Sequence, residues 1–293
     1  MPETETIQAQ GPTESADPTF ANILCAISGR EGGFAAVEQA ASLAGTQGLL
    51  TLLAVTSYRS GGARRAPAIG PTRAAEILGG AEAIAREAGV PYTSEVDPRS
   101  PPARVILDWS SKYDLLALGA PASSWPAKLL SVGVGDKALG GFSSALLVAR
   151  PLAAGRRLGD LIVVASDGLQ SSDALVDLAG RLAHAHGSSV TLAHALGREP
   201  LIKRGRSRGQ QGMVEGQEEV LHRARAAASG ESLVKPGRPA DVIKSAAAET
   251  DASLVVMGSR RLDGLRAMGS VSRRVVHQAR CSVLLVPPET LTR

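Results

Sequence analysis

Residues 254–287 read LVVMGSRRLDGLRAMGSVSRRVVHQARCSVLLVP, and this stretch decides the fold. It opens with LVVM and closes with SVLLV, two short apolar runs that are typical of buried strands. Between them lie a glycine-containing loop and an amphipathic segment that begins at Gly269-Ser270, which predicts a helix. Strand, loop, helix and strand in this order form the unit of a parallel sheet covered by helices.

The chain contains this pattern twice. ILCAISG at 23–29 matches IVVASDG at 162–168, and LLALGA at 115–120 matches LVVMGS at 254–259, in both cases 139 positions later. ALLVA at 145–149 matches VLLVP at 283–287 at nearly the same offset. Self-similarity at one offset predicts a duplicated module. We expect a leader at 1–20, a first domain at 21–151, a linker at 152–159, a second domain at 160–288 and a tail at 289–293.

Each copy alternates short apolar runs with longer amphipathic stretches, so we expect five strands per copy with helices between them. The predicted strands are 23–27, 49–56, 91–96, 115–119 and 145–149 in the first copy, and 161–166, 189–195, 231–235, 253–257 and 282–286 in the second. A helix over 175–186 would start at Ser171 or Ser172 and stop at Gly187. The predicted fold class is α/β, with two tandem open parallel five-stranded sheets flanked by helices in a Rossmann-like arrangement.

Composition narrows the protein class. Hydrophobic residues make up 44% of the 293 residues, charged residues 20% and aromatics only 3%, which is typical of a globular chain with an aliphatic core. The run LLTLLAV at 49–55 is far shorter than the roughly 20 residues that cross a bilayer, so we expect no membrane span. The net charge of +4 is a mild excess that does not by itself indicate nucleic acid.

The cysteines and the N-terminal residues indicate a reducing compartment. Cys25 and Cys281 both lie in or beside apolar strand-like runs and offer no disulfide framework. The first 29 residues contain no Lys or Arg, whereas a secretory signal begins with basic residues and continues into an apolar block. Residues 1–20 are rich in Pro, Thr, Glu and Gln, which predicts disorder. We therefore expect a cytoplasmic protein.

Candidate binding residues lie where the predicted strands end, because ligands of open parallel sheets bind beyond the carboxyl ends of the strands. Asp167 follows the first strand of the second copy and could accept hydrogen bonds from a ligand, or serve as a turn or cap residue. Gly258 follows the fourth strand and allows a ligand to approach the backbone. Gly269-Ser270 opens the next helix, where unpaired amides favour a phosphate; alternatively, Ser270 is only a helix cap.

These residues, the tandem repeat and the stretch 254–287 together resemble the universal stress protein family, in its two-domain form, over residues 21–288. The nucleotide-binding branch of that family carries a Gly, two residues, a second Gly, nine residues, and then Gly with Ser or Thr. The resemblance implies an adenine-contacting acid at Asp167, a backbone contact to adenine at Ala195, a ribose and phosphate contact at Gly258, and phosphate contacts at Gly269 and Ser270.

The sequence departs from this pattern in both copies. Arg261 occupies the second glycine position, and seven residues separate it from Gly269. If that glycine has a positive φ, an L-residue there costs on the order of 1 to 2 kcal/mol, unless the shortened loop takes another path. In the first copy Ser28 replaces the acid, and Val132-Gly133 stands where Gly-Ser is expected. We therefore expect the first copy to be a pseudo-symmetric partner without a site.

The resemblance implies a cytoplasmic stress-response module that binds ATP or another adenine nucleotide in its second domain, with Mg²⁺ accompanying the nucleotide. No general base or nucleophile is evident near the expected phosphates, so we assign no catalytic residue and expect at most slow ATP hydrolysis. An interaction scaffold of the same fold without nucleotide is the alternative. A nucleotide-cleaving enzyme would need a glycine-rich phosphate loop after the first strand, where this chain reads SDGLQSSD. Protein partners are not indicated.

Three other features carry weaker hypotheses. His184, His186 and His194 lie close in sequence, but no Cys joins them at zinc spacing and we expect no metal site. The basic run at 198–208 is a solvated loop or a flap over an anion; it has no aromatics for stacking, so we do not expect nucleic acid binding. The last strands, ALLVA and VLLVP, could pair within one chain, which makes an intramolecular pseudo-dimer and leaves homodimerisation optional.

Overall fold

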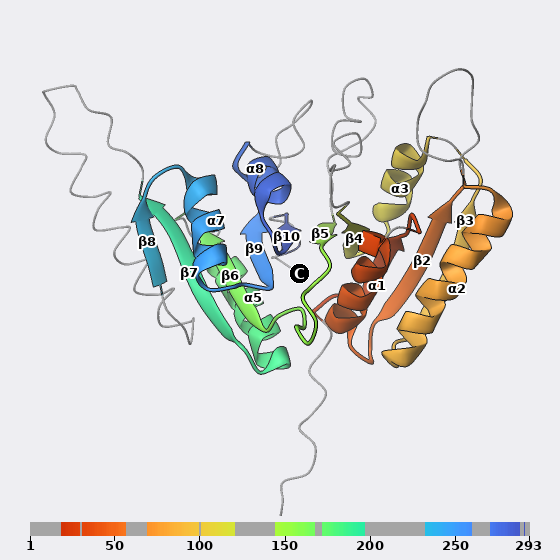
Figure 1. Ribbon diagram of the computed structural model, residues 1–293, viewed down its shortest axis with the longest axis horizontal. Helices are drawn as coiled ribbons and strands as arrows, with labels where there is room; N and C mark the ends of the chain where they lie inside the picture. The colour runs from red at the N-terminus through yellow and green to blue at the C-terminus, as the bar shows by residue number, and fades with distance from the viewer. Residues whose placement is uncertain are drawn as a thin grey trace, which may run out of the picture.

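Ten strands form one continuous sheet that runs across the whole molecule, from β8 at the left of Figure 1 to β3 at the right. The computed structural model describes residues 19–29, 31–56, 69–99, 101–120, 144–167, 172–196, 232–259, 270–287 and 290. The strand order is β3-β2-β1-β4-β5-β10-β9-β6-β7-β8. We refer to β1–β5 with their helices as the first half, and to β6–β10 with theirs as the second half.

The elements follow one another in the same alternation in both halves. In the first half they are β1 (Asn22–Ala26), α1 (Glu31–Ala44), β2 (Leu49–Val55), α2 (Pro71–Glu87), β3 (Tyr92–Asp97), α3 (Pro102–Ser110), β4 (Leu115–Gly119) and β5 (Ala145–Ala149). In the second half they are β6 (Leu161–Ser166), α5 (Asp173–His186), β7 (Ser189–Leu196), β8 (Ser232–Pro236), α7 (Pro239–Glu249), β9 (Leu254–Gly258), α8 (Ser270–Gln278) and β10 (Ser282–Val286).

All strand pairs within each half are parallel, as the alternation of elements predicts. The two halves meet where β10 pairs with β5 in the antiparallel direction, with Leu284 opposite Leu147. We call this β5–β10 junction the seam; it lies at the centre of Figure 1. The predicted pairing of the last strands within one chain is thus confirmed, and it joins the two expected five-stranded sheets into one.

Aliphatic side chains fill two core layers, one on each face of the sheet. One layer contains buried residues of α1, α2 and α5, and the other contains buried residues of α3, α7 and α8. The central strands are buried on both faces; β5 and β10, for example, have all five residues buried. This explains why their sequences are continuous apolar runs without alternation.

Several element boundaries follow directly from local chemistry. Gly187 ends α5 in the left-handed conformation, with φ of 62°, which an L-residue adopts only at a cost. Ser172 is the residue before α5, in agreement with the start predicted at Ser171 or Ser172. The strand predicted at 231–235 begins one residue later and includes Pro236, as an edge strand can.

The connection between the halves is packed against the second half. Leu158 is buried in the core layer of α5, and the Gly159 amide donates to the Ser253 hydroxyl oxygen at 3.1 Å. The Arg156 guanidinium forms an ion pair with Asp251 at 2.6 Å. Phe20, the last residue of the expected leader, is 2% exposed and packs in the core layer of α1. No helix among the described residues is long and apolar enough to cross a membrane.

Candidate functional site

The candidate site lies at the carboxyl ends of β6, β7 and β9, which are neighbours in the sheet. The β6–β7 pairing ends at Ser166 opposite His194, so Asp167 and Ala195 are each the first residue beyond that pair. Gly258 is the last residue of β9, between β6 and β10. Three of the five predicted residues, Asp167, Ala195 and Gly258, therefore reach the same edge of the sheet.

The other two predicted residues belong to the start of α8. Gly269 lies outside the described residues, and Ser270 is the first residue of the helix. The Ser272 hydroxyl donates to the Gly258 carbonyl oxygen at 3.3 Å, which connects the first turn of α8 to the end of β9. The helix amides that lack partners in that turn are thus near the backbone of Gly258, where an anionic group would be favoured. Arg260, Arg261 and Arg266, whose charges could neutralise a phosphate or be solvated, lie outside the described residues.

Asp167 is exposed, but part of its carboxylate is used locally. The Ser172 hydroxyl donates to Asp167 Oδ1 at 2.8 Å and accepts from the Asp167 amide at 3.1 Å. This pair closes the turn before α5, which is the turn role that the sequence left open for Asp167. Because a carboxylate has about four acceptor positions, this turn role and a ligand contact are compatible.

His194 is a buried polar residue beside this site. Its Nδ1 lies 3.0 Å from the Ser166 carbonyl oxygen, which can only accept, so Nδ1 carries the proton. Its Nε2 is buried and has no hydrogen-bond partner among the residues that the structure describes. His184 and His186 lie on α5, and no group of three or more His, Cys, Asp or Glu side chains suited to a metal ion occurs among the described residues.

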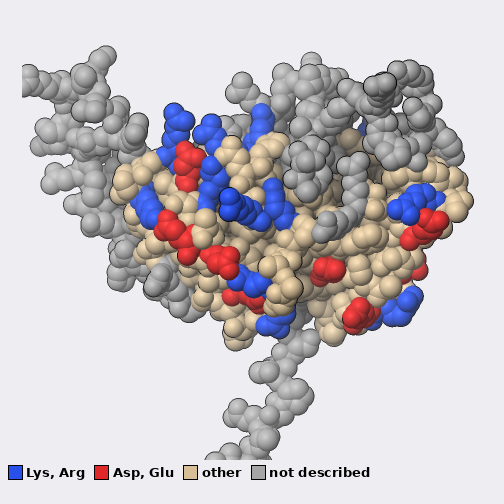
Figure 2. Space-filling view, in the orientation of Figure 1, with Lys and Arg blue, Asp and Glu red and all other residues tan. Residues whose placement is uncertain are grey.

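Positive charge gathers on the face of the second half that carries α7 and α8, as Figure 2 shows. On α8, Arg273 and Arg274 are exposed and lie one turn after Ser270. Neither forms an ion pair with a described carboxylate. These side chains add to the helix N-terminus a field that attracts an anion.

The equivalent edge of the first half is closed by backbone. Gly119 occupies the position in β4 that Gly258 occupies in β9, 139 residues later. A Cβ on Gly119 would collide with the Gly32 carbonyl and the Gly33 amide at the start of α1. A Cβ on Gly258 would meet only Leu175 Cδ1, at 3.3 Å, among the described atoms within 4 Å. The start of α1 thus occupies space beside β4, whereas beside β9 the described residues place only the Leu175 side chain within 4 Å of the equivalent position.

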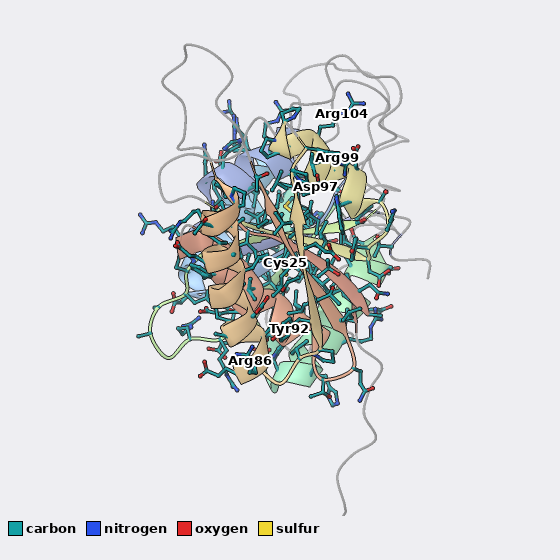
Figure 3. All side chains as sticks on the ribbon, turned by 90° about the vertical axis from the view of Figure 1, so that its right-hand side faces the viewer. Cys25, Arg86, Tyr92, Asp97, Arg99 and Arg104 are labelled. Atoms are coloured by element: carbon teal, nitrogen blue, oxygen red, sulfur yellow. The ribbon has the colours of Figure 1, made fainter. Side chains whose placement is uncertain are left out.

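The first half also contains an ionic cluster that the sequence analysis did not identify. The Arg99 side chain donates to both carboxylate oxygens of Asp97, and Trp109 Nε1 donates to Asp97 Oδ2 at 2.8 Å. Figure 3 shows Asp97 and Arg99 together at one end of β3, with Tyr92 at the other end of the strand. The hydrogen bonds from Arg99 hold the pKa of the Asp97 carboxyl well below its usual range. Because both oxygens of Asp97 have several donors, this cluster fastens α3 to β3 and leaves little capacity for a ligand.

Comparisons with known proteins agree with the duplicated fold. The model of the universal stress protein family matches residues 19–150 and 160–287. A protein from Thermus aquaticus, named "Universal stress protein in QAH/OAS sulfhydrylase 3'region", is 34% identical over 137 residues, which cover 43% of this chain and 96% of that protein.

A solved structure shares the fold over nearly the whole chain. A putative universal stress protein from Pseudomonas aeruginosa has a TM-score of 0.67 at 15% identity, covering 94% of this chain and 96% of that one. A universal stress protein from Archaeoglobus fulgidus, solved in complex with dAMP, is 22% identical with a TM-score of 0.31, covering 43% of this chain and 94% of its own. The two family matches, one to each half, establish that this chain belongs to the universal stress protein family as a tandem member.

Proposed function

We propose that the second half binds an adenine nucleotide, with ATP as the ligand and Mg²⁺ as its counter-ion, and that the protein is a stress-response module of the cytoplasm. The observation that carries the proposal is the open edge at Gly258. There, no backbone among the described residues comes as close as the start of α1 comes to Gly119, and the first turn of α8 is connected to the strand end through Ser272.

The proposed contacts follow from the chemistry of each group. Asp167 would accept hydrogen bonds from the base, and the backbone of Ala195 would meet its edge. Gly258 would allow the ribose to approach, and Gly269 and Ser270 would hold phosphate at the start of α8. Asp167 would contact the base and not the phosphates, so it would not serve as a general base for hydrolysis. We therefore propose binding with little or no hydrolysis.

Calorimetric titration of the full chain with ATP and Mg²⁺ tests the proposal, with dAMP as a second adenine probe. Asp167→Ala removes a hydrogen bond to a charged acceptor and should raise the Kd at least tenfold. The matched control is Ser28→Ala, which changes the equivalent position of the first half and should leave the Kd within twofold. Protein denatured after purification should also release nucleotide.

Two results would overturn the proposal. One is the absence of binding heat at millimolar ATP together with no released nucleotide; this outcome would support the alternative of an interaction scaffold without nucleotide. The other is an equal loss of affinity in Asp167→Ala and Ser28→Ala, because the two positions belong to different halves.

A further inference from the structure

Arg150 connects the two halves across the seam. It follows the last residue of β5, in the first half, and its side chain reaches α8 in the second half. Its Nη2 donates to the Val276 carbonyl oxygen at 2.7 Å, and its Nη1 donates to the Cys281 carbonyl oxygen at 3.4 Å. Val276 lies in the last turn of α8, so a residue of the first half satisfies a carbonyl at the end of a helix of the second half.

A buried ring of hydrogen bonds fixes the backbone of Arg150. Gln39 Nε2, on α1, donates to the Arg150 carbonyl oxygen at 2.6 Å. The Arg150 amide donates to Ser282 Oγ at 3.0 Å, and that hydroxyl donates to Gln39 Oε1 at 2.7 Å. Gln39 is 3% exposed and Ser282 is fully buried, which shields these bonds from water. The position of the guanidinium is thus set by α1 and β10 together.

The helix that Arg150 contacts is short. α8 has nine residues, fewer than an isolated helix needs to be stable in water, so its order depends on contacts at its ends and along its buried face. At its start Ser272 donates to Gly258, and at its end Arg150 donates to Val276. A cation at the negative end of the helix dipole is also favourable.

Arg150 makes these contacts without a carboxylate partner among the described residues. Burial lowers the pKa of its guanidinium from the ordinary value, which shows that the charge is partly withdrawn from water. The carbonyl oxygen of Val276, in α8, and that of Cys281, directly before β10, replace part of that lost hydration. The contact is therefore specific to this helix end and is not a loose surface ion pair.

We infer that Arg150 is a positioning residue for the nucleotide site of the second half: it holds the end of α8 so that the first turn of the helix stays in place for phosphate. This inference rests on the proposed function. It gives the first half, whose own edge is closed at Gly119, a part in the site of its neighbour. It also predicts reciprocal coupling, in which bound nucleotide slows hydrogen exchange at the seam.

Full-length Arg150→Met tests the inference, because methionine keeps much of the length and removes every donor. We expect the Kd for ATP to rise about tenfold and the amides of residues 273–278 to exchange faster. Arg156→Met is the matched control: it removes another arginine of the same connection, whose hydrogen bonds go to Asp251 and not to α8. It should leave both measurements within twofold of wild type.

The outcomes are separable. If wild type gives no binding heat, the proposed function fails, and the exchange of α8 alone decides whether Arg150 holds the helix. If wild type binds ATP, an unchanged Kd and unchanged exchange in Arg150→Met overturn the inference. Ser282→Ala should raise the Kd by a smaller factor, because it loosens the backbone of Arg150 and keeps its guanidinium. Circular dichroism confirms folding, and Arg150→Lys, expected to recover part of the affinity, replaces Arg150→Met if that variant does not fold.

Discussion

Replacing each strand-end glycine by alanine measures the difference between the two halves directly. In Gly119→Ala the new methyl group would meet backbone atoms of Gly32 and Gly33, which cannot rotate away, so the start of α1 has to move. Overpacking of this kind costs about 3 kcal/mol. In Gly258→Ala the nearest described atom is Leu175 Cδ1, the end of a flexible side chain at 3.3 Å. A shift of a few tenths of an ångström costs less than about 1 kcal/mol, and lower entropy of the unfolded chain offsets part of it.

Urea unfolding followed by two probes checks this prediction. The two tryptophans, Trp109 and Trp125, both lie in the first half of the sequence, so fluorescence reports on that half while circular dichroism reports on the whole chain. At a urea slope of about 2 kcal/mol per molar, a loss of about 3 kcal/mol moves the fluorescence midpoint of Gly119→Ala down by roughly 1.5 M urea. Gly258→Ala should keep its unfolding midpoint within a few tenths of a molar of the wild-type midpoint. Equal midpoint shifts in the two variants would refute the claim that Gly119 is packed more tightly than Gly258.

Two further predictions concern ionisable side chains. Asp97→Asn should destabilise the first half by about 1 kcal/mol at pH 7, a value reduced because Arg99 is exposed. Folding lowers the pKa of Asp97, so this contribution is complete above the unfolded pKa of about 4 and is lost as the pH falls toward the lower folded pKa. The stability gap between wild type and variant, followed by Trp109 fluorescence, should therefore begin to narrow below about pH 4 and narrow further down to pH 2; a constant gap would contradict this. Burial raises the pKa of Cys25 to about 12 and of Cys281 to about 11, so iodoacetamide at pH 8 should leave both thiols unlabelled by mass spectrometry until denaturant is added; rapid labelling of the native protein would show that one of them opens to solvent.

The sequence predicts the central strands best, for a physical reason. The bounds 115–119, 145–149, 161–166 and 282–286 agree with the structure, because these strands are buried and their apolar runs stop where burial stops. Edge strands give a weaker signal. β3 reads YTSEVD and is largely exposed, so its ends depend on pairing with β2 and not on hydrophobicity. Both edge strands, predicted at 91–96 and 231–235, are accordingly shifted by one residue. The central strands predicted at 23–27 and 253–257 are shifted by one residue as well, so burial alone does not fix every boundary.

The sequence predicts the end of a helix where a single residue decides it. Gly187 was identified as the end of α5 because glycine enters the left-handed region without penalty. The ring of hydrogen bonds around the Arg150 backbone could not be predicted, because Gln39, Arg150 and Ser282 are far apart in sequence and none belongs to a local motif. Only the pairing of β5 with β10 brings them together, and that pairing is a property of the whole sheet.

The candidate site shows most clearly what a sequence does not encode locally. Gly119 and Gly258 each end an apolar fourth strand, in LLALG and LVVMG, and no neighbouring residue distinguishes them. Their described neighbours differ: the backbone of α1 lies against Gly119, and among the described residues only a leucine methyl lies within 4 Å of the equivalent position at Gly258. A glycine at a strand end is therefore required for close helix packing in the first half, and in the second half it is the position where we propose that a ligand approaches. Because the fold is duplicated, one half can lose access to its own strand ends without the loss of the other half's proposed site. The first half, closed at Gly119, instead contributes Arg150 to α8, the helix beside the proposed site of the second half.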